Sequence, residues 1–171
     1  TLALTGVIPP ALEDRWTMEE RNLLLHDGIA TFMVQAGDVV AIERQVTMYQ
    51  TNRWGMPDPS YLDVNTPATL GYIRYATRAR ILQKYPRHKL ASDGTRYGAG
   101  QAIVTPSVIR GELLALYREL EEAGIVENFD QYKADLIVER NANDRNRVDV
   151  LAPPDLVNQF RIFAMKTMYV L

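Results

Sequence analysis

The sequence predicts an α+β fold, and three observations carry that prediction. Capped amphipathic segments occur at 17–28 and 105–124, segments with strand periodicity flank short turns near both ends of the chain, and the last residues form an apolar run. The predicted sheet is mixed or antiparallel. It combines an N-terminal hairpin with a C-terminal hairpin plus a terminal strand, and it packs with two main helices and one short N-terminal helix.

Composition places the chain among ordinary globular proteins. Of 171 residues, 47% are apolar and 23% are charged, which predicts a single domain over 1–171. A net charge of −2 gives no basic field for nucleic acid, and the absence of cysteine excludes disulfides and thiolate metal sites. No apolar run approaches the ~20 residues of a membrane helix. Because Thr1 is not a methionine, we expect a fragment of a longer protein.

The N-terminal part predicts a short helix followed by a hairpin. Thr17 and Glu20 have the spacing of a capping box, in which each side chain bonds the backbone N–H of the other residue. Gly28 then provides a left-handed C-cap. Segments 30–34 and 39–49 alternate in polarity around a short turn, which predicts two antiparallel strands. The segment after them, 52–63, has the glycines, prolines and aromatics of an ordered loop.

Two longer helices are predicted in the middle of the chain. The first starts at Asn65 or Thr66 and ends before Pro86, and its polar side is basic. The second is capped by Thr105, ends near Gly124 and has an acidic polar side. Its apolar stripe consists of Val108, Ile109, Leu113, Leu116, Tyr117 and Leu120.

The C-terminal segment predicts a hairpin, 135–140 with 147–151, followed by a strand over 159–171. That strand is apolar at both parities, which is typical of a strand covered on both faces. Two alternatives stay open for the source of the cover. The strand is central in the sheet of its own domain, or it lies against another chain.

Candidate catalytic groups are few, and none forms a recognised motif. His26 and His88 lack the spacing of zinc ligands, and His26 suits a helix C-terminus. Ser92, His88 and Asp93 can be combined into a triad only by their proximity in sequence. The glycines of 94–100 lack the Lys-Ser/Thr ending of a phosphate loop. We therefore predict no catalytic, cofactor-binding or metal residue, no cofactor, and no enzymatic activity.

Several stretches resemble the C-terminal domain of contractile phage tail sheath proteins, most closely the Mu-like phage sheath family. They follow one another in order over 8–171: ALEDRWTMEERNLLLHDGIATF, YQTN, SYLDVNTPATLGYIRYATRARI, YPRHKL, GQAIVTP, DLIVERN and APPDLVNQF. The specificity of the resemblance lies in this succession and not in any single motif.

The resemblance implies a structural subunit of the virion's contractile tail, assembled in the host bacterial cytoplasm. Such subunits polymerise helically around a tail tube and drive the tube through the host envelope on contraction. The implied partners are other sheath subunits, joined by exchange of terminal arms, and the tail tube protein. No nucleic acid partner and no membrane insertion by this domain are expected.

The resemblance also directs attention to two groups of residues. Strand addition uses backbone hydrogen bonds and side-chain pockets, and the apolar C-terminal strand suits it. The expected strand-exchange residues are Phe160, Ile162, Phe163, Met165, Met168, Tyr169 and Leu171. The expected tube-contact residues, on the basic helix, are Arg74, Arg78, Arg80 and Lys84.

Two other functions stay open from the sequence. One is a baseplate or adaptor-type interaction domain of a phage tail. The other is a hydrolase or transferase that uses His88 with an Asp or Glu on the 87–105 loop.

Overall fold

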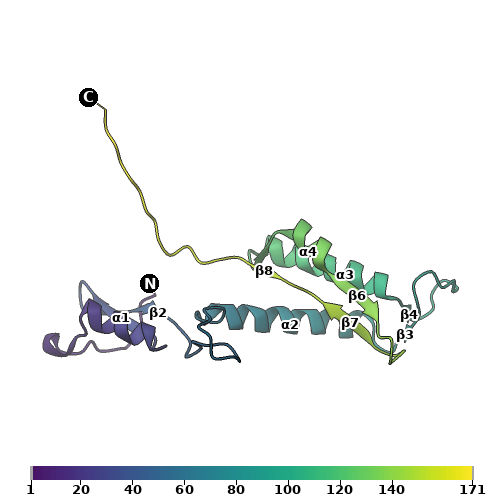
Figure 1. The fold of residues 1–171 in the computed structure, drawn as a ribbon, viewed down its shortest axis with the longest axis horizontal. Helices are drawn as coiled ribbons and strands as arrows, with labels where there is room; N and C mark the ends of the chain where they lie inside the picture. The colour runs from purple at the N-terminus through teal and green to yellow at the C-terminus, as the bar shows by residue number, and fades with distance from the viewer. Residues whose placement is uncertain (1, 171) are drawn as a thin grey trace. The chain divides into compact units, whose positions relative to one another are not determined.

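The computed structural model describes residues 2–170, and its contacts divide the chain into two compact units. Unit 1 is Thr1–Tyr72 and unit 2 is Ile73–Leu171. Figure 1 labels most of their helices and strands. The prediction of a single domain over 1–171 stays a prediction.

Unit 1 contains a short 3-10 helix, η1 (Leu12–Asp14), then α1 (Met18–His26) and the antiparallel strands β1 (Thr31–Gln35) and β2 (Val39–Arg44). The capping box is confirmed: the Thr17 hydroxyl accepts from the Glu20 N–H, and the Glu20 carboxylate accepts from the Thr17 N–H. Leu2 and Leu4 add backbone hydrogen bonds to the other edge of β2.

The predicted second strand, 39–49, is shorter in the structure. Beyond Arg44 the backbone leaves β1 and bonds to the segment before α2. Val46 forms an isolated bridge with Asp63, and the Thr47 N–H donates to Leu62 O at 2.7 Å. The ordered loop predicted at 52–63 is present, and the Asn52 carboxamide accepts from two backbone N–H groups within it.

The long helix α2 (Asn65–Lys84) spans the division between the units. Unit 2 continues with β3 (Lys89–Leu90), β4 (Ile103–Val104), α3 (Pro106–Glu122), β5 (Val126–Glu127), α4 (Phe129–Asp135), β6 (Ile137–Arg140), β7 (Val148–Leu151) and β8 (Asp155–Leu156). Pairs β5–β8 and β6–β7 are antiparallel, whereas β3–β4 is parallel. The α+β class is confirmed. Within residues 2–170, however, the strands form separate two-stranded sheets.

The core of unit 2 is organised around α3. The apolar periodicity of the α3 sequence predicted most of the face that this helix buries. Thr105 caps the helix, and Pro106 occupies its first turn. The prediction that Val108 belongs to the buried apolar stripe of α3 is wrong. Val108 is exposed, because it lies about 140° around the helix from Leu113. The buried cluster contains Val104, Ile109, Leu113, Leu116, Tyr117, Leu120, Val126, Tyr132 and Leu136.

Segment 159–170, predicted as a strand, forms no strand in the structure. Short elements that the sequence analysis missed complete unit 2: helix α4 and the strand pairs β3–β4 and β5–β8. No helix within residues 2–170 is both long and apolar enough to span a membrane.

Gly28 closes α1 in the left-handed conformation predicted for it, with φ +77°. A Cβ at this position would lie 2.9 Å from Met48 Cα and 3.0 Å from Thr47 O. Both neighbours are backbone atoms, so they cannot move aside as a flexible side chain does. The glycine therefore allows α1 to pack directly on the backbone that follows β2.

We expect Gly28→Ala to lower the free energy of unfolding by about 3 kcal/mol, since backbone strain and steric overlap act together. Gly37→Ala is the control, because Gly37 has φ +79° and open space around its Cβ direction. That change should cost about 1 kcal/mol. Urea denaturation of both variants measures the difference, and equal effects would contradict the close approach.

Candidate assembly surfaces

The last part of the chain begins at a firmly bonded root. In β8, Asp155 and Leu156 pair with β5, and the Val157 N–H donates to Ile125 O at 3.2 Å. The Tyr117 hydroxyl donates to Glu127 O at 2.6 Å and accepts from the Asp155 N–H at 3.2 Å. These bonds hold β8 against the core of unit 2.

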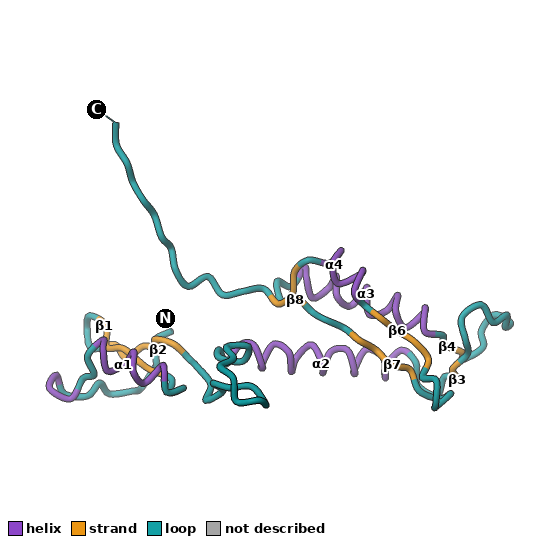
Figure 2. The backbone as a smooth tube through the Cα atoms, viewed as in Figure 1, coloured by secondary structure: helices purple, strands orange, loops and turns teal. Residues whose placement is uncertain are grey.

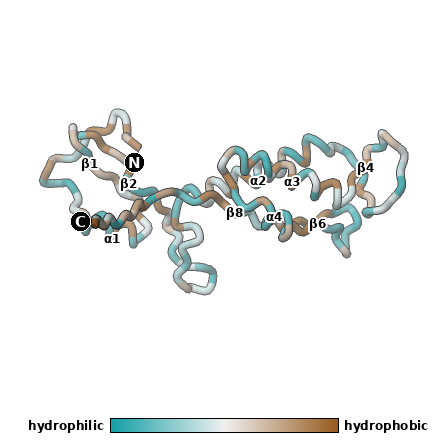
Figure 3. Tube along the Cα trace, turned by 90° about the horizontal axis from the view of Figure 1, so that it is seen from above, coloured by the Kyte–Doolittle hydropathy of each residue, from teal (hydrophilic) through white to brown (hydrophobic). Residues whose placement is uncertain are grey.

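Beyond this root, residues 158–170 form no backbone hydrogen bond with the described chain. We call this segment the arm. Figure 2 shows it as one extended stretch, and Figure 3 shows its apolar character. Its large apolar side chains are exposed: Phe160 84%, Ile162 82%, Phe163 75%, Met165 74%, Met168 79% and Tyr169 83%. Leu171, the last predicted interface residue, lies outside the described residues.

The alternative of a central core strand is therefore wrong for residues 159–170. Burial of each such side chain contributes about 1.5–3 kcal/mol, and within residues 2–170 the arm obtains none of this. The apolar pattern at both parities belongs here to a segment that has no cover within residues 2–170. Assignment of these residues to strand exchange stays a prediction.

The β6–β7 hairpin offers open edges near one end of α3. Its register pairs Ile137 with Leu151 and Arg140 with Val148, and α3 contacts β6. Within residues 2–170 neither strand has a second strand partner. Ile137, Val150 and Leu151 are exposed at 50%, 45% and 63%. Unpaired edges with exposed apolar side chains are where an added strand can bind.

The four predicted tube-contact cations fall into two groups. Arg80 and Lys84 point to α3, where both form ion pairs with Glu112. Arg80 Nη1 lies 3.1 Å from Glu112 Oε1, and Lys84 Nζ lies 2.7 Å from Glu112 Oε2. Arg80 also pairs with Glu119. Arg74 and Arg78 are exposed and form no ion pair within residues 2–170.

Arg74 and Arg78 share a helix face because they are four residues apart. Two apolar side chains of α2 lie close to them on the helix surface and are also exposed, Tyr75 at 71% and Leu82 at 61%. This face of α2 is therefore basic and partly apolar. Sequence periodicity placed all four cations on the polar side, but only the tertiary fold separates the two that are already paired.

We expect Glu112→Gln to lower the free energy of unfolding by about 2 kcal/mol, because it removes the buried carboxylate that pairs with both cations, leaving Lys84 without a charged partner and Arg80 with Glu119 alone. Glu122→Gln is the matched control on the same helix. Glu122 is exposed and forms no ion pair within residues 2–170, so that variant should change stability by less than about 0.5 kcal/mol. Chemical denaturation gives both values. Equal stability of the two variants would contradict the role of Glu112.

The candidate catalytic residues do not come together as a triad. The His88 ring packs edge-on against Tyr85, and its Nδ1 lies 3.1 Å from Pro86 O. The Ser92 hydroxyl accepts from Arg140, and Asp93 accepts from the Ser107 N–H and hydroxyl. Bonds from Ser107 hold the pKa of Asp93 below its ordinary value, so this carboxylate acts as a charged cap of α3.

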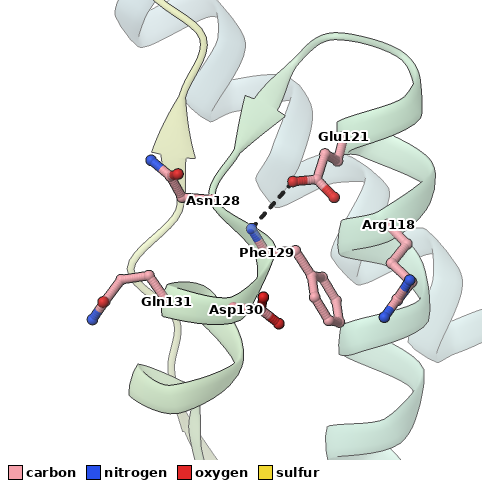
Figure 4. A pocket seen from close by; sticks show the side chains of 6 residues that line it. All are labelled: Arg118, Glu121, Asn128, Phe129, Asp130 and Gln131. Carbon is pink, nitrogen blue, oxygen red and sulfur yellow. Dashed lines mark hydrogen bonds between the residues drawn. The ribbon is translucent and has the colours of Figure 1, made fainter.

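A polar hollow of about 440 Å³ lies at the opposite end of α3. Figure 4 shows its lining, in which the Glu121 carboxylate accepts from the Phe129 N–H at 3.1 Å. The Arg118 guanidinium stacks over the Phe129 ring, 4.0 Å from its centre. Asn128, Asp130 and Gln131 complete the lining. Among residues 2–170 no group of His, Cys, Asp or Glu could hold a metal ion.

Comparison with known proteins gives two family matches. The phage tail sheath C-terminal domain matches residues 56–169, and the phage tail sheath central domain matches residues 1–48. The first match covers most of the chain, including α2, α3, the β6–β7 hairpin and nearly all of the arm. The chain belongs to the phage tail sheath family.

A curated relative of this sheath chain is the Mu-like prophage FluMu tail sheath protein of Haemophilus influenzae. It is 55% identical over 165 residues, which is 96% of this chain. The chain spans about a third (34%) of the length of that relative. The resemblance inferred from the sequence is thereby confirmed. A structural sheath family gives no support to the hydrolase alternative.

The arm root was not predicted from the sequence. Tyr117 was assigned only to the apolar stripe of α3, and Asn128 and Asp155 were not singled out. Yet Asn128 Nδ2 donates to the Asp155 carboxylate at 2.6 Å and strengthens the root. No one-dimensional pattern joins residues so far apart in sequence.

Proposed function

We propose that this chain is a structural segment of a contractile tail sheath subunit, which links copies of the subunit by exchange of its arm. The observation that carries the proposal is the arm itself: an anchored root followed by apolar side chains that lack cover in residues 2–170. A neighbouring copy supplies that cover. The resemblance to sheath proteins and the family matches support the same role.

The β6–β7 hairpin is the proposed receptor for the arm of the neighbour. Its edges are unpaired in the described chain, and Ile137 and Leu151 leave apolar surface beside them. An added strand gains backbone hydrogen bonds from the edge and pockets from the side chains. The residues proposed to take part are Phe160, Ile162, Phe163, Met165, Met168, Tyr169 and Leu171.

We propose further that the sheath polymer surrounds the tail tube as part of the virion tail, and that contraction drives the tube through the host envelope. The exposed face of α2 with Arg74 and Arg78 is the proposed tube contact. Exposed ion pairs contribute only ~0–1 kcal/mol each, so repeated contacts of this kind can release during contraction. The ion pairs of Arg80 and Lys84 with Glu112 hold α2 against α3 and so fix the position of this face in unit 2.

Deletion of 159–171 from the full-length sheath protein should block polymerisation, because the exchanged segment is lost. Electron microscopy and sedimentation measure the polymer. A milder variant, Phe160→Asp with Ile162→Asp, should act in the same direction by placing charge in the apolar contact. The control is Glu13→Lys, since Glu13 is exposed in η1 of unit 1. Normal polymers from the deletion variant would refute arm exchange, and closed rings of fixed number would favour an adaptor.

Limited trypsin digestion gives an independent check of the arm. Arg161 and Lys166 are exposed in the isolated chain, so unassembled protein should be cut there first. In assembled protein the rate of cleavage at these two sites should be at least about tenfold lower, because bound strands resist cleavage. Cleavage at equal rates before and after assembly would contradict the proposal.

Reversal of charge at Arg74→Glu and Arg78→Glu should abolish co-assembly with the tail tube while leaving tube-free sheath polymers intact. Arg53→Glu is the control, because Arg53 belongs to unit 1 and stacks on Trp54. Co-sedimentation with purified tubes measures the effect. Undiminished tube binding by the double variant would argue against this face.

A further inference from the structure

Unit 2 carries opposite charge at the two ends of α3. The N-terminal end of the helix lies beside β3, β4 and the β6–β7 turn, and the C-terminal end lies beside β5, α4 and β8, as Figure 1 shows. Seventeen helical residues separate the ends by roughly 25 Å. We call them the basic end and the acidic end for the residues described next.

Hydrogen bonds from the Arg140 side chain hold the segments of the basic end together. Its guanidinium donates to Arg145 O at 2.7 Å, to Ser92 Oγ at 3.0 Å and to Leu90 O at 3.3 Å. These bonds hold the β6–β7 turn against β3 and the loop after it. As a result, cations from two distant parts of the chain meet at one end of unit 2.

These cations lack partners in the described chain. Segment 87–101 holds three Lys or Arg residues against one carboxylate, Asp93, which is used in capping α3. Arg145 is exposed, and within residues 2–170 its side chain forms no ion pair. The cations without an ion pair at this end are Arg87, Lys89, Arg96 and Arg145.

The acidic end has the opposite composition. Segment 119–135 holds six Asp or Glu residues and one Lys. The last turn of α3 contains no basic residue, although Glu119, Glu121 and Glu122 lie there. Carboxylates at a helix C-terminus oppose the helix dipole at a cost of about 0.3–1 kcal/mol each. Glu119 pairs with Arg80 and Glu121 accepts from the Phe129 N–H, whereas Glu122 and Asp130 are exposed, form no ion pair within residues 2–170 and are available to an incoming cation.

The two ends also differ in shape. The acidic end contains the polar hollow of Figure 4, which is lined by the carboxylates of Glu121 and Asp130 together with Arg118, Asn128, Phe129 and Gln131. The basic end presents the β6–β7 turn, whose tip carries Arg145 and Arg147. A projecting turn with cations fits a hollow with carboxylates.

We propose that the basic end of one copy docks on the acidic end of the next, with the β6–β7 turn entering the hollow beside α4. This inference deepens the proposed function and depends on it, since the partner is a second copy of this chain. Such a contact joins two different surfaces, so it repeats head to tail. Contacts of this class produce open helical polymers unless the rotation closes a ring.

The docking contact and the arm act by different physics. Arm exchange buries apolar surface and should depend little on salt, whereas the docking contact is electrostatic and weakens as salt screens it. Complementary charge also speeds association and rejects wrong partners. A polymer joined by both contacts therefore has an electrostatic recognition step in addition to the apolar link.

The test uses full-length sheath protein with Arg145→Glu, with Glu122→Lys, and with both. Both side chains are exposed and neither forms an ion pair within residues 2–170, so the fold should be retained. Each single reversal should raise the concentration needed for polymerisation about tenfold at low salt, measured by light scattering without tube protein. The double variant should recover to within about threefold, because each reversed end meets a reversed partner. Glu13→Lys in unit 1 is the charge-matched control.

Each outcome has a defined meaning. Recovery in the double variant, with single-variant defects that shrink at 0.5 M salt, supports the docking contact. Normal polymerisation of both single variants overturns it while leaving arm exchange untouched. Defects without recovery in the double variant also overturn it, because the two ends are then not partners. The deletion of 159–171 tests arm exchange alone, so failure of that proposal is distinguishable.

Discussion

The contact on which unit 2 most depends is the one made by Tyr117. Its ring stacks on Tyr132 with centres 3.7 Å apart, and it belongs to the buried cluster around α3. Its hydroxyl bonds the backbone of both β5 and β8. Burial raises the pKa of Tyr117, so the phenol stays protonated and remains a donor to Glu127 O. One side chain therefore joins the core to the root of the arm.

This arrangement explains how a small unit can carry an exposed apolar segment. The core around α3 is complete without the arm, because Tyr132, Leu136 and Val126 already cover the helix. Loss or movement of the arm leaves those contacts in place. Folding of unit 2 therefore does not require the arm, and the bonds of Tyr117 mark the boundary between the folded core and the arm.

Local signals in the sequence predicted much of the fold. The capping pair Thr17–Glu20, the start of α3 at Thr105 and the β6–β7 hairpin were all correctly placed because each depends on residues close in sequence. Helix α4 was missed because it has only seven residues. A segment of that length, with apolar positions at Phe129 and Tyr132, is too short to show a helical period. The β3–β4 pair was missed because its two strands contain only two residues each.

The candidate surfaces were predictable only in part. Apolar residues at both parities indicated a covered strand, but that pattern is the same for a core strand and for an arm, and only the fold distinguishes them. Likewise, helical periodicity placed Arg80 and Lys84 beside Arg74 and Arg78. Their partner Glu112 lies about 30 residues away in sequence, and no local rule connects them.

The anchored root also sets a mechanical limit. Residues 158–170 span at most about 45 Å when fully extended, and any residues paired to a neighbour shorten the remaining tether. If copies are joined by the proposed arm exchange, residues 158–170 allow them to rotate and slide past one another within that reach without separating. Under that proposal, the reach of residues 158–170 is the tether that limits how far two linked copies move between one packed arrangement and another.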